Sequence, residues 1–335
     1  MKMKAVLLNS QGQVLSDLNT NLLFRHNKNN PCSLLTALQS KLLQESTKII
    51  VLKYGFLVIS ESTKNNCFWM THNCGLFSCL TTLAWSILEL QEAKYRITEI
   101  NNSLSMSHFK NSQYCNSYNR LYEAIERDST PLVPKTRLKL STPYFNHHGN
   151  YSEIINNLLG REWIKNMIES YMKPTARIKN KIEFLSQKYE LIEKNALFVC
   201  YRGTDKYKEV SPAPIEHYFN ESDKFFDNHP KGRVIIQTDQ EQVRQEFAQR
   251  YDRKCCHFEE LPATFGTTVM HCAGMPRQHR QEWCEYLIAA VIAASKCTAV
   301  VTHTGNVGFH VAMHALIAGK AVTQMDLFSN QAYWQ

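Results

Sequence analysis

Long apolar runs are missing from this 335-residue sequence. A membrane-spanning helix needs about 20 consecutive apolar residues, and no stretch approaches that length. The first residues, MKMKAVLLNSQGQVL, turn polar too soon for a secretory signal. We therefore expect no integral membrane segment, and a soluble protein that is cytoplasmic or is exported without a cleaved signal peptide. The glycosylation sequons at Asn101, Asn150 and Asn220 are then chance matches.

A regular cysteine framework is also missing, although the chain has 11 cysteines. An odd and irregularly spaced set argues against a disulfide-stapled secreted domain and favours a reducing compartment. No Gly-X-Gly-X-X-Gly follows an apolar strand pattern, which disfavours a dinucleotide oxidoreductase. No Asp-X-Asp occurs, so the carboxylate pair that holds Mg²⁺ or Mn²⁺ in metal-dependent transferases is lacking, and we predict no metal cofactor.

Basic residues are only mildly in excess: the formal net charge is +8 at pH 7, and Lys and Arg are scattered along the chain. This balance fits an anionic ligand such as a nucleotide, and we do not expect nucleic-acid binding. The length exceeds what a single core usually supports, so we expect two domains. Helical periodicity over 153–171 and 175–189 places their junction near Pro174, with domains at 1–174 and 175–335.

Regular patterns are sparse in the first half and frequent in the second. In the first half, 4–10 and 49–60 resemble strands, 75–91 has apolar residues at helical spacing, and 101–120 predicts a polar surface loop. In the second half, strands are predicted at 197–201, 233–238, 254–258, 267–272 and 298–303. Helices are predicted between and after them at 213–226, 240–251, 279–295 and 306–318. This alternation indicates an α/β fold with a doubly wound parallel sheet.

Polar residues follow three of the predicted strands. They are Arg-Gly-Thr-Asp-Lys at 202–206, Thr-Asp-Gln at 238–240 and Thr-His-Thr-Gly-Asn at 302–306. Ligands of doubly wound sheets bind outside the carboxyl ends of the strands. A guanidinium can grip a phosphate there, and a helix that begins after Thr-Gly-Asn offers free backbone N–H groups to an anion. The three strand ends therefore predict a phosphate or nucleotide site.

Each segment also has a plain structural interpretation. The Thr-Asp pair at 238–239 and the polar residues at 304–306 could simply cap the helices that follow them. Arg202 could form a surface salt bridge with Asp205 or Glu209. A separate cluster, Cys255-Cys256-His257 with His271-Cys272, could in principle hold zinc. Adjacent residues on a strand point to opposite faces, however, so only part of each group could converge.

Taken in order and spacing, four segments resemble one family. YRGTDKYKEV followed by SPAPIEHYF, then IIQTDQEQVRQEF, then VTHTGNVGFHVA are similar to three motifs of the fucosyltransferase superfamily, closest to its core and nodulation-type members and their bacterial or viral relatives. NCGLFSCLTTLAWSILEL resembles the Gly-Phe-Phe-Ser loop and helix that open the acceptor domain of these proteins. The resemblance covers the C-terminal half and one island in the first half.

The resemblance implies a GT-B-like glycosyltransferase in which two Rossmann-like domains face a cleft, with the acceptor side at 1–174 and the nucleotide-sugar donor side at 175–335. It implies inverting, metal-independent transfer from GDP-fucose to a glycan or protein acceptor, with no further cofactor. Arg202 matches the family's essential arginine, and Glu209 lies within one residue of the base carboxylate of some relatives. The other implied substrate-binding residues are Gly75, Phe77, Ser78, Gly203, Thr204, Asp205, Lys206, Thr238, Asp239, Glu285, His303, Thr304, Gly305 and Asn306.

Three positions depart from the family pattern. Cys200 stands where the first motif usually begins with His, Gly203 where a second Arg often follows, and Gln240 where core fucosyltransferases carry a second Asp. These changes leave the identities of base and sugar open, so a different sugar donor is one alternative. A catalytically silent nucleotide-sugar-binding module is another. Glu209 could also be a solvated loop residue, and Glu285 a solvent-facing helix charge.

Overall fold

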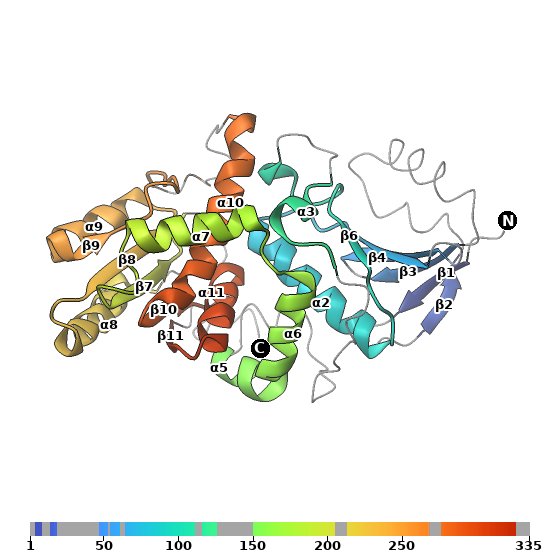
Figure 1. Ribbon diagram of the computed structural model, residues 1–335, viewed down its shortest axis with the longest axis horizontal. Helices are drawn as coiled ribbons and strands as arrows, with labels where there is room; N and C mark the ends of the chain where they lie inside the picture. Colours follow the sequence, from blue (N-terminus) through green and yellow to red (C-terminus); the bar gives the residue numbers. More distant parts are fainter. Residues whose placement is uncertain are drawn as a thin grey trace.

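The computed structural model describes residues 4–8, 14–18, 47–52, 54–60, 64–110, 116–125, 150–204, 213–266, 268 and 276–325. Figure 1 shows two sheets at opposite ends of the molecule, with helices between them. No helix in these ranges is both long and apolar enough to cross a membrane.

The N-terminal sheet is mixed. Its six strands within the described residues are β1 (Lys4–Leu8), β2 (Val14–Leu18), β3 (Thr47–Leu52), β4 (Gly55–Ser60), β5 (Asn65–Met70) and β6 (Glu99–Asn101), in the order β2-β1-β3-β4-β5-β6. Only β1 with β3 and β5 with β6 pair in parallel. Strands joined by a short turn, such as β3 and β4, pair antiparallel because a parallel neighbour needs a crossover connection. This half therefore differs from the Rossmann-like sheet that the family resemblance implied.

The C-terminal sheet is all parallel in the described part of the chain. Its strands are β7 (Ala196–Tyr201), β8 (Arg233–Thr238), β9 (Cys255–Cys256), β10 (Ala299–His303) and β11 (Ala321–Met325), in the order β11-β10-β7-β8-β9. The α/β class and the parallel sheet are thus confirmed. The edge strand β11 was not predicted, and the segment expected near 267–272 lies almost wholly outside the described residues.

Helices cover both faces of this sheet. They are α8 (Ile215–Asn228), α9 (Glu241–Tyr251), α10 (Arg277–Ala293) and α11 (Asn306–Ile317). Alternate residues of β7 enter different cores: Leu197 and Val199 pack with side chains of α8 and α9, whereas Phe198 and Cys200 join the cluster that contains α10 and α11. The sheet is therefore doubly wound, as expected.

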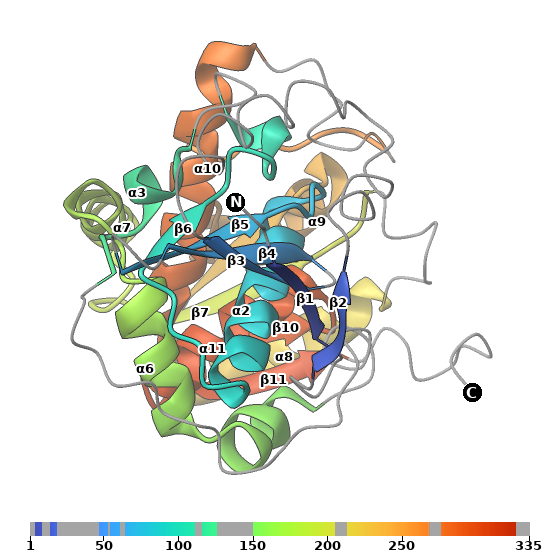
Figure 2. The ribbon, with the colours of Figure 1, turned by 90° about the vertical axis from the view of Figure 1, so that its right-hand side faces the viewer.

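The helices between the sheets come from both halves of the chain. They include α2 (Leu76–Glu92), α6 (Arg161–Tyr171) and α7 (Ala176–Lys188). Figure 1 shows α2 between the two sheets, and Figure 2, seen from the side of the N-terminal sheet, shows α2 beside α11. One buried apolar cluster contains Leu80 of α2, Trp163 of α6 and Phe309 of α11. The helix predicted over 153–171 is wrong in detail: a short helix α5 (Tyr151–Glu153) and a π-helical turn at 154–158 precede Gly160, whose φ of 84° breaks the helix before α6 begins.

Candidate functional site

The strand order places a topological switch point between β7 and β10. From β7 the chain proceeds to β8 on one side, and from β10 it proceeds to β11 on the other. In open parallel sheets this is the point where helices on opposite faces leave a crevice at the carboxyl ends of the strands. Arg202 follows β7, and Thr304 follows β10. Two of the three predicted strand ends therefore flank the position where a ligand of this fold class binds.

Asp239, just after β8, holds the segment that follows β7. Its Oδ1 accepts a hydrogen bond from Gly203 N at 3.1 Å, and its Oδ2 accepts one from Thr204 Oγ1 at 2.6 Å. The same Oδ2 lies 3.3 Å from Arg202 Nε. One carboxylate thus fixes a guanidinium, a main-chain N–H and a hydroxyl. Asp239 therefore does more than cap the helix that follows it. Thr238, whose Oγ1 accepts from Gln240 N at 3.1 Å, closes the turn behind Asp239.

Gly203 and Gln240 fit against one another. A Cβ on Gly203 would lie 1.8 Å from Gln240 Oε1, so any larger residue would displace the glutamine side chain. Gln240 Nε2 in turn donates to Gly266 O at 3.0 Å. Two positions that depart from the family pattern are therefore in direct contact, and each one accommodates the other.

The turn from β10 into α11 depends on two glycines. Gly305 has a φ of 133°, a conformation that other residues rarely adopt. A Cβ on Gly308 would lie 1.7 Å from His303 O, so only glycine lets α11 approach the end of β10 this closely. Tyr151 Oη accepts a hydrogen bond from Gly305 N at 2.6 Å and donates to Gly305 O at 2.9 Å. A side chain from the first half of the chain thus braces the turn.

The N-terminus of α11 leaves main-chain donors open at the switch point. The first helical hydrogen bond runs from Phe309 N to Gly305 O. The N–H groups of Asn306, Val307 and Gly308 therefore precede the helical ladder, and they have no partner among the described residues. Asn306 Oδ1 is also buried without a described partner. These open donors, together with the positive end of the helix dipole, form an anion-binding geometry.

Cys200 and His303 lie side by side beneath this turn. Cys200 Sγ is 3.8 Å from His303 Nε2, and His303 Nδ1 is 2.8 Å from Thr304 O. The carbonyl can only accept, so Nδ1 carries the proton and Nε2 is left to accept from the thiol. Burial raises the pKa of the Cys200 thiol to about 12, so the thiol is neutral at pH 7. Cys200 therefore contributes a neutral thiol, and not a nucleophilic thiolate, to the floor of the site.

Of the predicted residues of the first half, Phe77 lies against α11. Gly75 precedes α2, Phe77 packs on the ring of His310 with centroids 5.2 Å apart, and Ser78 Oγ is 2.8 Å from His72 Nε2. Thr81 Oγ1 is 3.3 Å from His310 Nε2. Phe77 is buried, so it acts in packing α2 against α11.

Glu285 lies in a different environment from the strand ends. Its side chain is fully buried, and its carboxylate contacts Arg120 Nε at 3.0 Å, Arg177 Nε at 2.7 Å and Lys181 Nζ at 3.8 Å. Arg120 belongs to α3 (Tyr118–Leu121), and the other two belong to α7. Glu285 thus joins α10 to α3 and α7, and its contacts among the described residues include none of the strand-end residues.

Several predicted residues lie outside the described residues. They are Asp205, Lys206 and Glu209, together with His271 and Cys272 of the possible zinc cluster. Among the residues that the structure does describe, no group of three or more His, Cys, Asp or Glu side chains could hold a metal ion. The general base and the absence of a metal cofactor therefore stay predictions.

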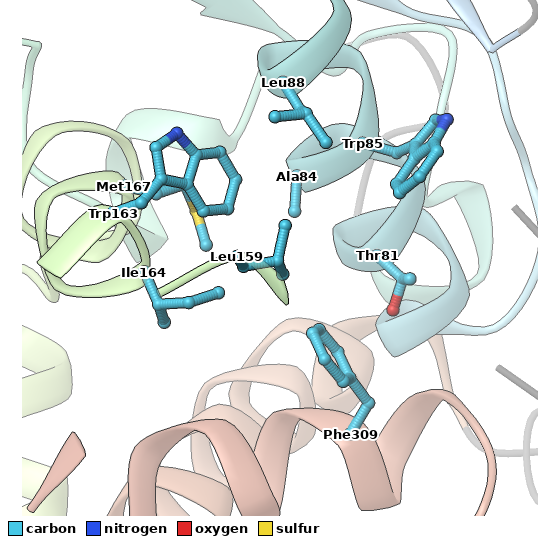
Figure 3. A pocket seen from close by; sticks show the side chains of 9 residues that line it. All are labelled: Thr81, Ala84, Trp85, Leu88, Leu159, Trp163, Ile164, Met167 and Phe309. Atoms are coloured by element: carbon cyan, nitrogen blue, oxygen red, sulfur yellow. The ribbon is translucent and has the colours of Figure 1, made fainter. Parts of the chain in front are cut away.

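A separate apolar cavity lies between α2, α6 and α11 (Figure 3). Its volume is about 20 Å³, which is room for about one water molecule, so it cannot hold a nucleotide or a sugar. Figure 3 labels its nine lining residues: Thr81, Ala84, Trp85, Leu88, Leu159, Trp163, Ile164, Met167 and Phe309. We interpret it as a packing defect between the halves.

Sequence reasoning missed the contact of Tyr151 with Gly305 and the two arginines that pair with Glu285. No local pattern around Tyr151 indicates that its hydroxyl reaches a residue more than 150 positions away. The contact of Gln240 with Gly203 was also missed, although both positions were noted as departures. In each case the signal is a tertiary contact, which the spacing of residues along the chain does not encode.

Comparison with known proteins gives similarities at the level of fold. No protein-family model and no curated protein matches the sequence. A structure of the fucosyltransferase NodZ from Bradyrhizobium is 14% identical with a TM-score of 0.44, over 74% of this chain and 92% of that one. NodZ alpha-1,6-fucosyltransferase co-crystallized with GDP gives 14% and 0.47, over 74% and 92%. The same enzyme soaked with GDP-fucose gives 15% and 0.48, over 81% and 98%.

Proposed function

We propose that this chain is a glycosyltransferase whose nucleotide-sugar donor binds by its diphosphate at the ends of β7 and β10. The observation that carries the proposal is that Arg202, held by Asp239, and the open N–H groups of α11 follow the two neighbouring strands at the switch point. A fixed guanidinium and a helix N-terminus are complementary to a diphosphate in charge and in hydrogen bonding. Asp239 joins the ends of β7 and β8, and β10 lies beside β7 in the sheet, which supports the expected convergence of the three strand ends.

The proposed reaction is an inverting displacement. An acceptor hydroxyl attacks the anomeric carbon of the sugar, the bond from that carbon to the diphosphate oxygen breaks, and the hydroxyl proton passes to a base. Arg202 and the α11 N-terminus stabilise the negative charge that develops on the leaving diphosphate, and no metal ion is required for that task. Glu209 remains our choice of base. The motif resemblance favours GDP-fucose as donor and a glycan or protein hydroxyl as acceptor.

Release of GDP from GDP-fucose, with and without a panel of glycan acceptors, tests this proposal. We expect Arg202→Ala to lower turnover about 100- to 1000-fold while leaving the fold intact, since it removes a donor to the leaving group. Arg250→Ala is the matched control: Arg250 pairs with Asp223 at 2.6 Å on the exposed surface of α8 and α9. Near-normal turnover in a folded Arg202→Ala protein would contradict the assignment.

A binding measurement beside the turnover assay separates the enzyme from a silent binding module. Thermal shift with GDP- and UDP-sugars measures donor binding independently of turnover, because a bound donor stabilises the fold by mass action. An enzyme should show a shift and GDP release that are both lost in Arg202→Ala. A shift without release under any acceptor would favour the module, and stabilisation by UDP-sugars alone would replace GDP-fucose with another donor.

A further inference from the structure

Phe265 is the most exposed large apolar side chain in the described part of the chain. About 64% of it is accessible, compared with 58% for Ile192 and 43% for Phe184. Its ring has no aromatic or cationic partner among the described residues. A single exposed apolar side chain is common on protein surfaces and by itself indicates nothing. What distinguishes Phe265 is that its two neighbours in the chain are held by hydrogen bonds at the end of β8.

Both neighbours of Phe265 are tied to the end of β8. Thr264 N donates to Asp239 O at 3.0 Å, and Glu241 N donates to Thr264 O at 3.0 Å, so Thr264 pairs in parallel beside Gln240. On the other side, Gly266 O accepts from Gln240 Nε2 at 3.0 Å. An exposed phenyl ring therefore stands on a segment whose two flanking residues are fixed by hydrogen bonds.

Asp239 and Gln240 also fix the segment after β7, which is the proposed diphosphate-binding segment. Asp239 holds Arg202, Gly203 and Thr204, and the side chain of Gln240 fills the space beside Gly203. The Phe265 segment and the Arg202 segment thus share one pair of anchors, residues 239 and 240. Thr264 lies two strand spacings from β7, or roughly 10 Å. This distance is similar to the one between the diphosphate of a nucleotide and its base.

We propose that the ring of Phe265 stacks on the nucleobase of the donor. The inference rests on the proposed function, because it assumes a nucleoside diphosphate whose phosphates lie at Arg202 and α11. A base has an apolar face that gains from contact with an aromatic ring, and stacking of this kind tolerates different bases. Phe265 therefore contributes to the affinity for the nucleoside part of the donor, and the strand ends contribute to the affinity for its diphosphate.

Calorimetric titration of the full chain with GDP, UDP and inorganic pyrophosphate tests this role. Stacking on an aromatic side chain predicts that Phe265→Ala weakens nucleotide binding about 5- to 150-fold and leaves pyrophosphate binding unchanged. Phe265→Tyr keeps the ring and should bind nucleotide within about twofold of wild type. Ile192→Ala is the matched control, because Ile192 is similarly exposed but precedes the amino end of β7, whereas the proposed site lies at the carboxyl ends of the strands.

The outcomes distinguish this inference from the function on which it rests. If Arg202→Ala abolishes GDP binding while Phe265→Ala matches wild type, the stacking role is wrong and the diphosphate site stands. If Phe265→Ala weakens pyrophosphate as much as GDP, the residue only supports the loop, and the inference is again overturned. If the wild-type protein binds neither GDP nor UDP, the inference and the proposed donor site fail together.

Discussion

The hydroxyl of Tyr151 lies 2.6 Å from the backbone nitrogen of Gly305, and it joins the first half of the chain to the turn that begins α11. Tyr151 N also donates to Gln324 Oε1 of β11 at 2.8 Å, and its ring packs edge-on against Phe309. The short helix α5 is therefore docked on the carboxyl edge of the C-terminal sheet. The unusual backbone of Gly305 is held by this contact as well as by its own lack of a side chain.

Tyr151→Phe should lower the free energy of unfolding by about 1–3 kcal/mol, because it leaves the buried N–H of Gly305 without its acceptor. Chemical denaturation measures the change. Tyr286→Phe serves as the control, since no hydrogen bond of the Tyr286 hydroxyl is present in the described part of the chain. Equal stability of the two variants would show that the Gly305 turn does not depend on Tyr151.

Asp239→Asn should weaken GDP binding about 10-fold. The amide keeps an acceptor but loses the charge that holds Arg202, and a charge-assisted hydrogen bond is worth roughly twice a neutral one. Calorimetric titration checks this, with Asp223→Asn, whose carboxylate pairs with Arg250 on the surface, as the control. Tighter binding in Asp239→Asn would mean that its charge repels the phosphates more than its contacts organise the site.

Gly308→Ala should cost about 3 kcal/mol of stability, because the new methyl group would meet a main-chain carbonyl oxygen at 1.7 Å and the helix would have to move away from β10. Gly75→Ala is the matched substitution, since a Cβ there meets no atom within 4 Å. Urea unfolding of the two variants gives the comparison. A Gly308→Ala protein as stable as Gly75→Ala would refute the close approach of α11 to His303.

His310 should make the protein sensitive to acid. Burial lowers its pKa to about 3, whereas the unfolded chain titrates near 6.5. Above pH 6.5 neither state binds the proton, and below it only the unfolded state does, so stability falls as the pH drops from 6.5 toward 3. Between pH 7 and pH 5 the loss is about 2 kcal/mol.

His310→Gln keeps a polar group near Thr81 and removes this titration. Its unfolding free energy should therefore fall by about 2 kcal/mol less than that of the wild-type protein over the same pH interval. His314, whose pKa is also lowered by burial, to about 4, is present in both proteins and cancels in the comparison. Parallel pH profiles for the two proteins would contradict the burial of a neutral His310.

Glu285 shows where sequence reasoning reached its limit. The helix that carries it was expected, but a helical pattern cannot say that Arg120 and Arg177 approach one carboxylate from two other helices. In the same way, Gly160 was included in a continuous helix because periodicity continued across it. The edge strand β11 was not predicted, because an exposed strand lacks the apolar run that marks a buried one.

The strands β7, β8 and β10 and the helix α11 were determined by the sequence itself, because local apolar periodicity and turn residues dictate where buried elements begin and end. That Arg202, Asp239 and Thr304 follow strands could be read from the same patterns. Only the tertiary structure decided which side chains meet: Asp239 with Arg202, Gln240 with Gly203, and Tyr151 with Gly305. Those contacts follow from strand order and from packing between the two halves, which are long-range properties that no local segment encodes.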